Sequence, residues 1–361
     1  MTSFTKLRDK LVTGGGNILV IQTAFLGDVV LLTPLLRAIR RALPRVEVSV
    51  VVQPEWSEIV AGWCDEVIPF AKRDPAQRAQ NWRELIGKLK RRRFDAALVP
   101  HRSLRSALTA LKAEIPHRIG FRRGVAGLLH HTKVPYKPTL YEGRRNLDLL
   151  RKLTEIDDDG LPELTPSAAD VNVVGERLHS LALPIKSFVV LAPASVWFTK
   201  EWHRLNYRAL ASRLQTEFRL PVVAVGAEAD RELCAGVVGE PNLNLAGGLT
   251  PLQTAALMAQ SRLVISGDTA PAHIATSAKA RQLIIFGSTT PRFGFAPPTP
   301  QARILGADLW CRPCTNHGRQ RCPLGKSPRC LTSLTVQNVV DSIRDWLKPE
   351  ANGAISKVNL A

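Results

Sequence analysis

The sequence contains no long apolar run, and this absence limits where the chain can act. No stretch approaches the roughly 18 apolar residues that a membrane-spanning helix needs. The first residues, MTSFTKLRDKLVTGGG, have no apolar core of the kind found in a secretory signal. We therefore expect a cytoplasmic protein without a membrane span.

Several widespread catalytic motifs are also missing. The sequence has no P-loop, no GxGxxG dinucleotide fingerprint, no HExxH zinc helix and no GxSxG nucleophile elbow. Interpretations as a P-loop kinase, a Rossmann dehydrogenase, a zinc protease or an α/β-hydrolase therefore lack support.

The charge is strongly positive and concentrated in one region. The formal net charge is +18, and residues 72–145 hold 19 Lys or Arg against 5 Asp or Glu. The densest part is the run KLKRRR, which includes Lys88, Arg91, Arg92 and Arg93. Such a face attracts nucleic acid, anionic lipid or a phosphorylated acceptor, or it serves only solubility. Aromatic residues are few there, which argues against a stacking platform for single-stranded nucleic acid.

Four of the six cysteines cluster near the C-terminus, at Cys311, Cys314, Cys322 and Cys330. In a cytoplasmic protein such a cluster suggests a metal more than disulfides. The spacing matches no common zinc motif, because the second pair lacks a CxxC arrangement. The alternatives are a structural metal with His317 as a further ligand, reduced structural thiols, or a labile disulfide.

Short apolar runs alternate with helical patterns in two blocks, which predicts a doubly wound α/β fold. The expected strands are residues 17–22, 46–52, 66–69, 94–99 and 118–121, then 188–191, 222–225, 263–265 and 283–286. The acidic segment 155–166, rich in Gly and Pro, predicts a linker. We therefore expect two domains, 1–168 and 169–361, with the final helix, 334–347, able to pack back on the first.

The stretch Ser261–Pro291 combines two expected strands with polar loops at their carboxyl ends. The helix between them starts at Thr269, with Pro271 in its first turn. In open α/β sheets ligands bind at this edge, and free N–H groups at a helix start suit a phosphate. On this stretch alone, an ordinary βαβ turn explains the pattern equally well.

Two motifs and one loop carry a resemblance to a known family. QTAFLGDV from Gln22, GDTAPAH from Gly267 and FGSTTP from Phe286 resemble the heptosyltransferases of glycosyltransferase family 9, type II more than type I. Their order and spacing agree from Ile18 to about Ile343. The resemblance implies a GT-B fold, in which two Rossmann-like domains with doubly wound parallel sheets face a central cleft.

The resemblance also implies an activity. An inverting glycosyltransferase of this kind would move heptose from ADP-heptose to the lipopolysaccharide inner core, on an anionic lipid A–Kdo acceptor. It would work at the inner face of the inner membrane, in peripheral contact with it, with no cofactor needed for catalysis and no nucleic acid bound. The alternatives are another GT-B nucleotide-sugar transferase or epimerase, and a non-catalytic basic module that binds nucleic acid.

Three residues receive the main roles by this resemblance. Asp28 would be the general base, although a helix dipole would lower its pKa; alternatively it only stabilises the helix start. Lys200 would meet the donor diphosphate, with Thr199 adding a hydroxyl, or it is only a solvated loop lysine. Asp268 would bind hydroxyls of the donor sugar, or serve as a turn residue.

Further donor-side candidates surround these three. Thr269 and the N–H groups of Ala270 and Ala272 would hold phosphate at the helix start. Many family members carry Gly at position 270, which matters if the site requires a positive φ. Glu228 would accept ribose hydroxyls, and Ser195 is a weaker phosphate-side candidate.

The remaining candidates are basic or imidazole side chains. His273 is either a buried structural histidine or a site residue. The candidates for acceptor or membrane contact are Lys88, Arg91, Arg92, Arg93, Arg122, Arg123, Arg144 and Arg145.

Overall fold

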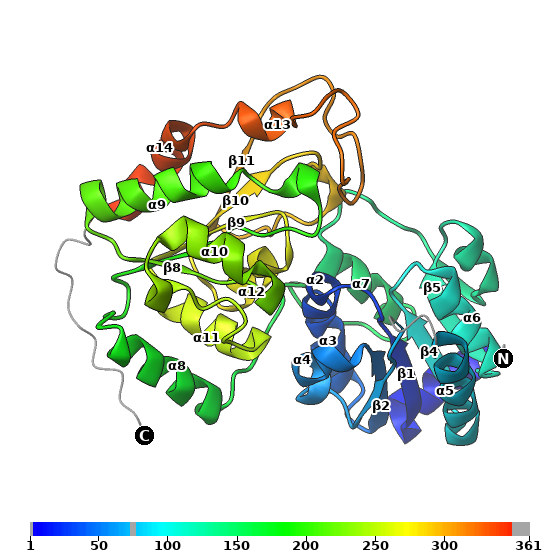
Figure 1. Cartoon of the computed structure of the whole chain (residues 1–361). Coiled ribbons are helices and arrows are strands. Elements are labelled where there is room, and N and C mark those ends of the chain that lie inside the picture. Colours follow the sequence, from blue (N-terminus) through cyan, green and yellow to red (C-terminus); the bar gives the residue numbers. More distant parts are fainter. Residues whose placement is uncertain (1–2, 73–76, 349–361) are drawn as a thin grey trace.

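The computed structural model describes residues 3–72 and 77–348 and contains two parallel sheets, each covered by helices (Figure 1). The tail at 352–361, which the sequence predicts to fray, lies outside the described residues. No helix of the described residues is long and apolar enough to cross a bilayer.

The first sheet has six parallel strands in the order β3-β2-β1-β4-β5-β6. They are β1 (Gly16–Ile21), β2 (Val46–Val52), β3 (Glu66–Pro69), β4 (Ala96–Val99), β5 (His117–Phe121) and β6 (Thr132–Val134). The central strands consist of buried aliphatic residues, as parallel strands covered on both faces require. The strand order reverses between β1 and β4, and in such folds ligands bind at that switch point.

The second sheet has five parallel strands in the order β11-β10-β9-β7-β8. They are β7 (Val189–Ala192), β8 (Val222–Ala224), β9 (Leu263–Gly267), β10 (Gln282–Phe286) and β11 (Ala302–Gly306). Here the switch point lies between β7 and β9.

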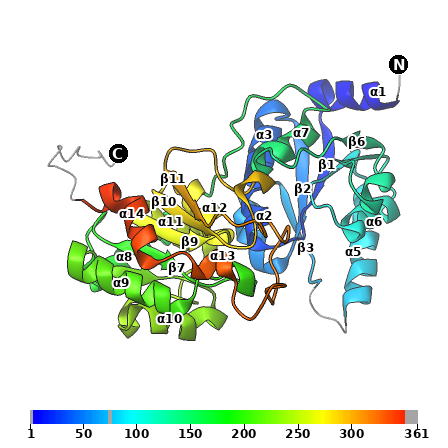
Figure 2. The same cartoon turned by 90° about the horizontal axis from the view of Figure 1, so that it is seen from above.

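Helices cover both faces of each sheet (Figures 1 and 2). Those of the first domain are α1 (Ser3–Asp9), α2 (Leu26–Val30), α3 (Thr33–Ala42), α4 (Ser57–Ala61), α5 (Arg78–Arg92), α6 (Leu104–Lys112) and α7 (Glu142–Leu150). Those of the second are α8 (Ala168–Ser180), α9 (Arg204–Phe218), α10 (Arg231–Val238), α11 (Pro251–Gln260), α12 (Ala270–Ser277), α13 (Arg329–Thr332) and α14 (Val336–Leu347).

The expected fold class is confirmed, and the differences lie mainly at the sheet edges. The pattern does not predict β6 and β11, each of which is one of the two edge strands in its sheet. Both are partly exposed, so neither shows a continuous apolar run. The helical pattern at 29–43 is split into α2 and α3, because Pro34 begins a new helix instead of continuing the first.

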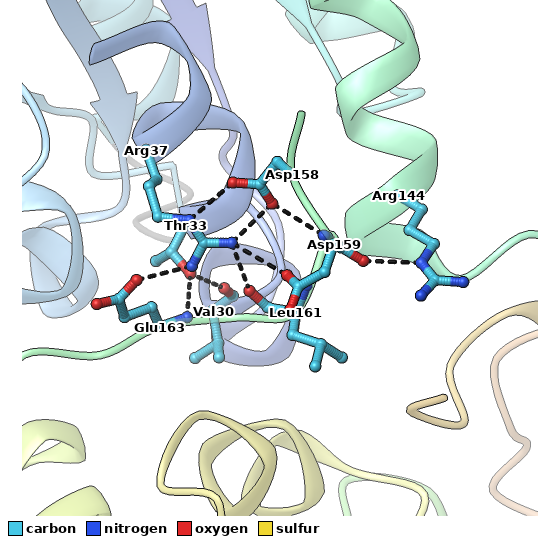
Figure 3. Close-up of polar contacts among 9 residues, drawn as sticks. Val30, Thr33, Arg37, Arg144, Asp158, Asp159, Leu161 and Glu163 are labelled. Atoms are coloured by element: carbon cyan, nitrogen blue, oxygen red, sulfur yellow. Dashed lines mark hydrogen bonds and ion pairs between the residues drawn. The ribbon is translucent and has the colours of Figure 1, made fainter. Parts of the chain in front are cut away.

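The acidic linker is held on the first domain by one buried arginine (Figure 3). Arg37 of α3 donates two hydrogen bonds to Asp158, at 2.7 and 2.8 Å, and another to Glu163 at 2.7 Å. The Glu163 N–H donates to the Thr33 hydroxyl at 2.9 Å. The linker lacks helix and strand, as predicted, but these contacts fix its path.

The final helix stays with the second domain. Its main contacts are with α9 and β11, while packing back on the first domain stays a prediction. The apolar face of α14, which includes Val340 and Ile343, is buried in contacts with the second domain. Helix α8, which begins at Ala168, packs on α11, while the boundary at 168/169 remains a prediction.

Direct contacts join the two domains. Helix α2 packs against α12, and a Cβ added at Gly27 would lie 3.0 Å from Cδ2 of His273. The N–H of Glu142 in α7 donates to the carbonyl of Gly294 at 2.7 Å. Glycine at position 27 therefore permits the close approach of the two switch points.

Candidate active site

The loops after the central strands of both sheets meet between the domains. The loop after β1 carries Asp28 in α2, and the loop after β9 carries Asp268 just before α12. Because α2 contacts α12, the two carboxyl ends lie close together, and Lys200 is near enough to Asp28 to lower the pKa of its carboxyl. The sequence-predicted candidates Asp28, Lys200 and Asp268 are therefore brought together.

Asp28 is half-buried and has no ion pair among the described residues, although three cations lie near it. Within the described part of the chain, its side chain accepts one long hydrogen bond, from the N–H of Phe25 at 3.3 Å from Oδ2. Burial raises the pKa of the Asp28 carboxyl, and this outweighs the opposing effects of the Phe25 N–H, Arg102 and Lys200. The expected lowering by a helix dipole does not prevail, so Asp28 is a stronger base than an exposed aspartate.

Lys200 and Asp268 form a buried ion pair across the loops after β7 and β9. Lys200 Nζ lies 2.8 Å from Asp268 Oδ2, and both side chains are largely shielded from solvent. The Thr289 hydroxyl donates to the same oxygen at 2.7 Å. A lysine held in this way presents a fixed positive charge at the switch point, where it can bind a diphosphate.

The start of α12 adds backbone donors and one unpaired buried nitrogen. Ala270 is helical and has no positive φ, so alanine fits where many family members carry glycine. The N–H of Ala272, however, donates to the carbonyl of Thr269 at 3.0 Å and is not available for phosphate. Nδ1 of His273 is buried without a partner in the structure. Burial lowers the pKa of His273 to about 4, so the imidazole is neutral.

Thr199 has a different role from the expected one. Its hydroxyl is buried, lies 2.8 Å from the hydroxyl of Ser288 and accepts the N–H of Arg319 at 2.8 Å. The hydroxyl therefore links the loop after β7 to the FGSTTP loop and to the cysteine-containing loop. These contacts leave it poorly placed to add a hydroxyl to a donor.

Three guanidinium groups surround the ring of Tyr136 on the first-domain side. Arg102, Arg123 and Arg145 lie 4.4, 4.6 and 4.3 Å from the ring centroid. Arg145 is fully buried, pairs with Glu142 at 2.6 Å and donates to the carbonyl of Phe293 at 2.9 Å. Arg145 is thus an interdomain contact and not an acceptor or membrane contact.

Arg102 and His317 are cleft residues that the sequence does not single out for this role. Arg102 is close enough to Asp28 to lower the pKa of its carboxyl. Burial lowers the pKa of His317, and Arg102 and Lys200 lower it further, so this histidine of the cysteine-containing loop faces both domains. The position of Arg102 directly after β4, at the switch point, is the signal that could have found it.

His101 lies beside Arg102 at the end of β4. Its Nδ1 lies 3.0 Å from the Ser106 hydroxyl and 3.3 Å from the Thr23 hydroxyl. Burial lowers the pKa of His101 to about 4, helped by Lys72 and Arg102. His101 is therefore a neutral histidine whose orientation is set by two hydroxyl groups.

Two donor-side candidates are engaged in local contacts. Glu228 is exposed and forms a two-pronged ion pair with Arg231, both bonds being 2.7 Å long. Ser195 accepts the N–H of Trp197 at 3.1 Å. Both lie in loops at the carboxyl ends of neighbouring strands, β8 and β7, as expected. Their roles in ribose and phosphate binding remain predictions.

The basic run on α5 is partly neutralised. Lys88 and Arg92 both pair with Glu66, at 3.0 and 2.5 Å. Arg91 and Arg93 are exposed, and Arg144 donates to the carbonyl of Asp159 at 2.7 Å. The run therefore presents less free charge than its sequence suggests.

The four clustered cysteines are reduced and lie near one another. Burial raises the pKa of the Cys330 thiol to about 11, and the neighbouring Cys314, Cys311 and Cys322 act in the same direction. Within residues 3–72 and 77–348, no group of three or more His, Cys, Asp or Glu side chains is arranged to hold a metal. A metal on this loop remains a prediction, which metal analysis of the purified protein tests.

Known proteins similar to this chain agree with the geometry. The model of glycosyltransferase family 9 (heptosyltransferase) matches residues 82–324. The lipopolysaccharide heptosyltransferase 1 of Pseudomonas aeruginosa is 29% identical over 365 residues, which cover 91% of this chain and 98% of that protein.

Two crystal structures share the fold. A family 9 glycosyltransferase of Veillonella parvula matches with a TM-score of 0.77 and 18% identity, over 94% of this chain and 98% of that one. The ADP-heptose lipopolysaccharide heptosyltransferase II of E. coli matches with a TM-score of 0.72 and 22% identity, over 92% and 98%.

Proposed function

Because the chain belongs to glycosyltransferase family 9, the heptosyltransferases, it is a glycosyltransferase, and we propose that it transfers heptose from ADP-heptose to the lipopolysaccharide inner core. The names of the similar proteins support this donor and this class of acceptor. The observation that carries the proposal is the position of Asp28, a half-buried carboxylate of raised pKa, near the Lys200 of the Lys200–Asp268 pair.

The chemistry is a single displacement. An acceptor hydroxyl attacks the anomeric carbon of the donor while Asp28 takes the hydroxyl proton. The bond from that carbon to the diphosphate breaks, and ADP departs with the electron pair. Attack on the face opposite to ADP inverts the anomeric configuration. General-base catalysis by a positioned carboxylate typically raises the rate of such a reaction by roughly 10²- to 10⁴-fold.

The leaving group is stabilised from the second domain. Lys200 and the N–H of Ala270 at the start of α12 supply the positive charge and the backbone donor that the departing diphosphate needs. Asp268, which holds Lys200 in the structure, also lies where the hydroxyls of the donor sugar would bind. In this scheme catalysis needs no cofactor.

The acceptor side is cationic. Arg102 and Arg123 stack on Tyr136 beside Asp28, and they suit the carboxylates and phosphates of a lipid A–Kdo acceptor. Such an acceptor is embedded in a bilayer, so the enzyme meets it in peripheral contact with the cytoplasmic face of the inner membrane. The domain boundary at 168/169 separates this side from the donor side.

The test is transfer measured with a panel of nucleotide-sugars. Acceptors are lipid A–Kdo with and without a first heptose, which distinguishes the type I from the type II reaction. We expect transfer from ADP-heptose with inverted anomeric configuration, read by NMR of the product. Interconversion of a nucleotide-sugar without acceptor indicates an epimerase instead. Salt-sensitive binding of DNA or RNA without nucleotide-sugar binding indicates a nucleic-acid-binding module.

A further inference from the structure

Helix α6 has its large apolar side chains on the outside. Its buried face consists of small or hydroxyl-bearing residues, namely Ser106, Ala107, Thr109 and Ala110. Leu104, Leu108 and Leu111, spaced at i, i+4 and i+7, share the opposite face. Leu104 and Leu111 are 46% and 37% exposed, and Leu108 is half-buried. A helix that only covers a sheet shows the reverse arrangement, with large apolar residues inside.

A neighbouring short helix extends this apolar surface. The 3-10 helix η3 (Val125–Leu129) packs against α6. Its Val125 and Leu128 are 64% and 71% exposed, more than either α6 leucine. We call the five side chains the α6–η3 patch: Leu104, Leu108, Leu111, Val125 and Leu128.

Basic residues border the α6–η3 patch. On α6, Arg105 and Lys112 follow Leu104 and Leu111 by one residue each, so they flank the leucine face. Arg122 lies just before η3 and is exposed. The nearby acidic Glu114 is paired with Lys90 at 2.6 Å. Lys112 also lies over the Trp82 ring, 5.9 Å from its centroid. Apolar tips bordered by cations match the chemistry of an anionic bilayer surface, which offers acyl chains below and negative headgroups above.

The α6–η3 patch also adjoins the acceptor side of the cleft. Helix α6 begins two residues after Arg102, and η3 begins two residues after Arg123. Both arginines stack on Tyr136, and Arg102 lies close enough to Asp28 to lower the pKa of its carboxyl. Figures 1 and 2 both show α6 on the side of the first domain that faces away from the second. A bilayer on this surface leaves the second domain free to bind its donor.

We propose that the α6–η3 patch is the surface that docks on an anionic lipid bilayer, with Leu111, Val125 and Leu128 entering the headgroup region. The inference rests on the proposed function, because it explains how a lipid-borne acceptor reaches Asp28. It keeps Arg122 from the candidates that the sequence offers and leaves out the charged run on α5. There, Lys88 and Arg92 are both tied to Glu66.

The experiment measures binding of the full chain to two kinds of vesicle by co-sedimentation. One kind contains phosphatidylethanolamine and phosphatidylglycerol, and the other contains phosphatidylcholine alone. The variants are Leu111→Asp and Leu128→Asp on the patch, Lys112→Gln at its border, and Arg91→Gln on α5. The matched control is Leu205→Asp, which changes a leucine of similar exposure (59%) at the start of α9 in the second domain.

Wild type and the Leu205→Asp and Arg91→Gln variants are expected to bind the anionic vesicles equally. Leu111→Asp and Leu128→Asp should each weaken binding about tenfold, because each withdraws one leucine from the apolar phase. Lys112→Gln should weaken it severalfold and only on anionic vesicles. Equal binding by wild type and the two leucine variants overturns the proposal. A wild-type dimer that either leucine variant makes monomeric, seen by light scattering, also overturns it, since the patch is then a self-interface.

Transfer to a water-soluble, deacylated acceptor separates this inference from the proposed function. The leucine variants should retain wild-type kcat/KM on that acceptor and lose activity only on acceptor presented in vesicles. Equal losses on both acceptors mean that the substitutions disturb the fold or the site, and this outcome also overturns the proposal. If the wild type transfers no heptose, the proposed function is refuted, and the vesicle-binding results alone then decide the docking proposal.

Discussion

Gly27-Asp28 and Gly267-Asp268 occupy equivalent places in the two sheets. Gly27-Asp28 lies in α2, after the central strand β1, and Gly267-Asp268 lies at the end of the central strand β9, just before α12; both strands border a switch point. Their surroundings differ. Asp268 accepts Lys200 at 2.8 Å and the Thr289 hydroxyl at 2.7 Å, whereas from residues 3–72 and 77–348 Asp28 accepts only a 3.3 Å hydrogen bond from Phe25.

This difference separates a carboxylate that can take a proton from one that holds a cation. Burial without an ion pair raises the pKa of Asp28, so it suits a general base. The charge of Asp268 is compensated by Lys200, and its use is to fix that lysine where a diphosphate arrives. The same dipeptide therefore acquires different chemistry from residues distant in sequence.

Replacing the unpaired aspartate should have the largest effect. Asp28→Asn keeps the size of the side chain but cannot accept the acceptor proton, so kcat should fall roughly 10²- to 10⁴-fold. The affinity for ADP, measured by calorimetry, should stay close to that of the wild type. Full activity in this variant would remove Asp28 from the role of base.

Breaking the pair on the other side should affect the donor instead. Lys200→Met removes the cation that meets the diphosphate, and kcat/KM for the donor should fall roughly 10²- to 10³-fold. It also leaves Asp268 buried without its cation, which should lower the free energy of unfolding by about 3–5 kcal/mol.

The double variant Lys200→Met/Asp268→Asn isolates that electrostatic cost. Stability in urea should recover, while transfer stays low. If donor kinetics in the single variant equal those of the wild type, Lys200 has no contact with the diphosphate.

Separating the two loops should have an intermediate effect. Gly27→Val places side-chain atoms against His273, where even a Cβ would lie at 3.0 Å, and pushes α2 from α12. Displacing the base from the donor by a fraction of an ångström should lower kcat roughly 10- to 100-fold. Gly236→Val is the control, because a Cβ there meets nothing within 4 Å. Equal kinetics of the two variants would show that close approach at Gly27 is unimportant.

Disturbing the linker should change stability more than activity. Arg37→Met leaves Asp158 buried without its cation, at a cost of about 3–5 kcal/mol in the free energy of unfolding, measured in urea. Because Arg37 contacts the linker and not the cleft, kcat in the folded protein should change less than about twofold. A loss of kcat comparable to that of Gly27→Val would mean that the linker sets the domain arrangement for catalysis.

Local sequence pattern predicts those structural features that depend on residues close together in the chain. Apolar runs predict the inner strands, and the polar loops after them mark the ligand-binding edge of each sheet. The grouping of Asp28 with Lys200 and Asp268 comes from the family resemblance. The edge strand β11 has no such run, and it is held by pairing with β10. That pairing is a tertiary contact that no local pattern records.

The rest depends on contacts between distant residues. Thr199 looks like a donor contact in sequence, yet Arg319 and Ser288, about 120 and 89 residues away, bury its hydroxyl. Arg145 looks like a surface cation, yet it bonds Phe293 across the domain interface. His317 belongs to a cysteine-rich loop and lies in the cleft only because that loop folds back over the second sheet.

The pH dependence of kcat/KM tests most directly whether Asp28 is the base. Asp28 must be ionised to take a proton, and burial raises its pKa, so activity should be lost on acidification at a pH above the ordinary aspartate value of about 3.9. Arg102 lowers this pKa, so Arg102→Gln should move the acid limb to higher pH. In Asp28→Asn the limb should vanish from the residual activity. An acid limb at the wild-type pH in Asp28→Asn would contradict the account, because another group would then be the base.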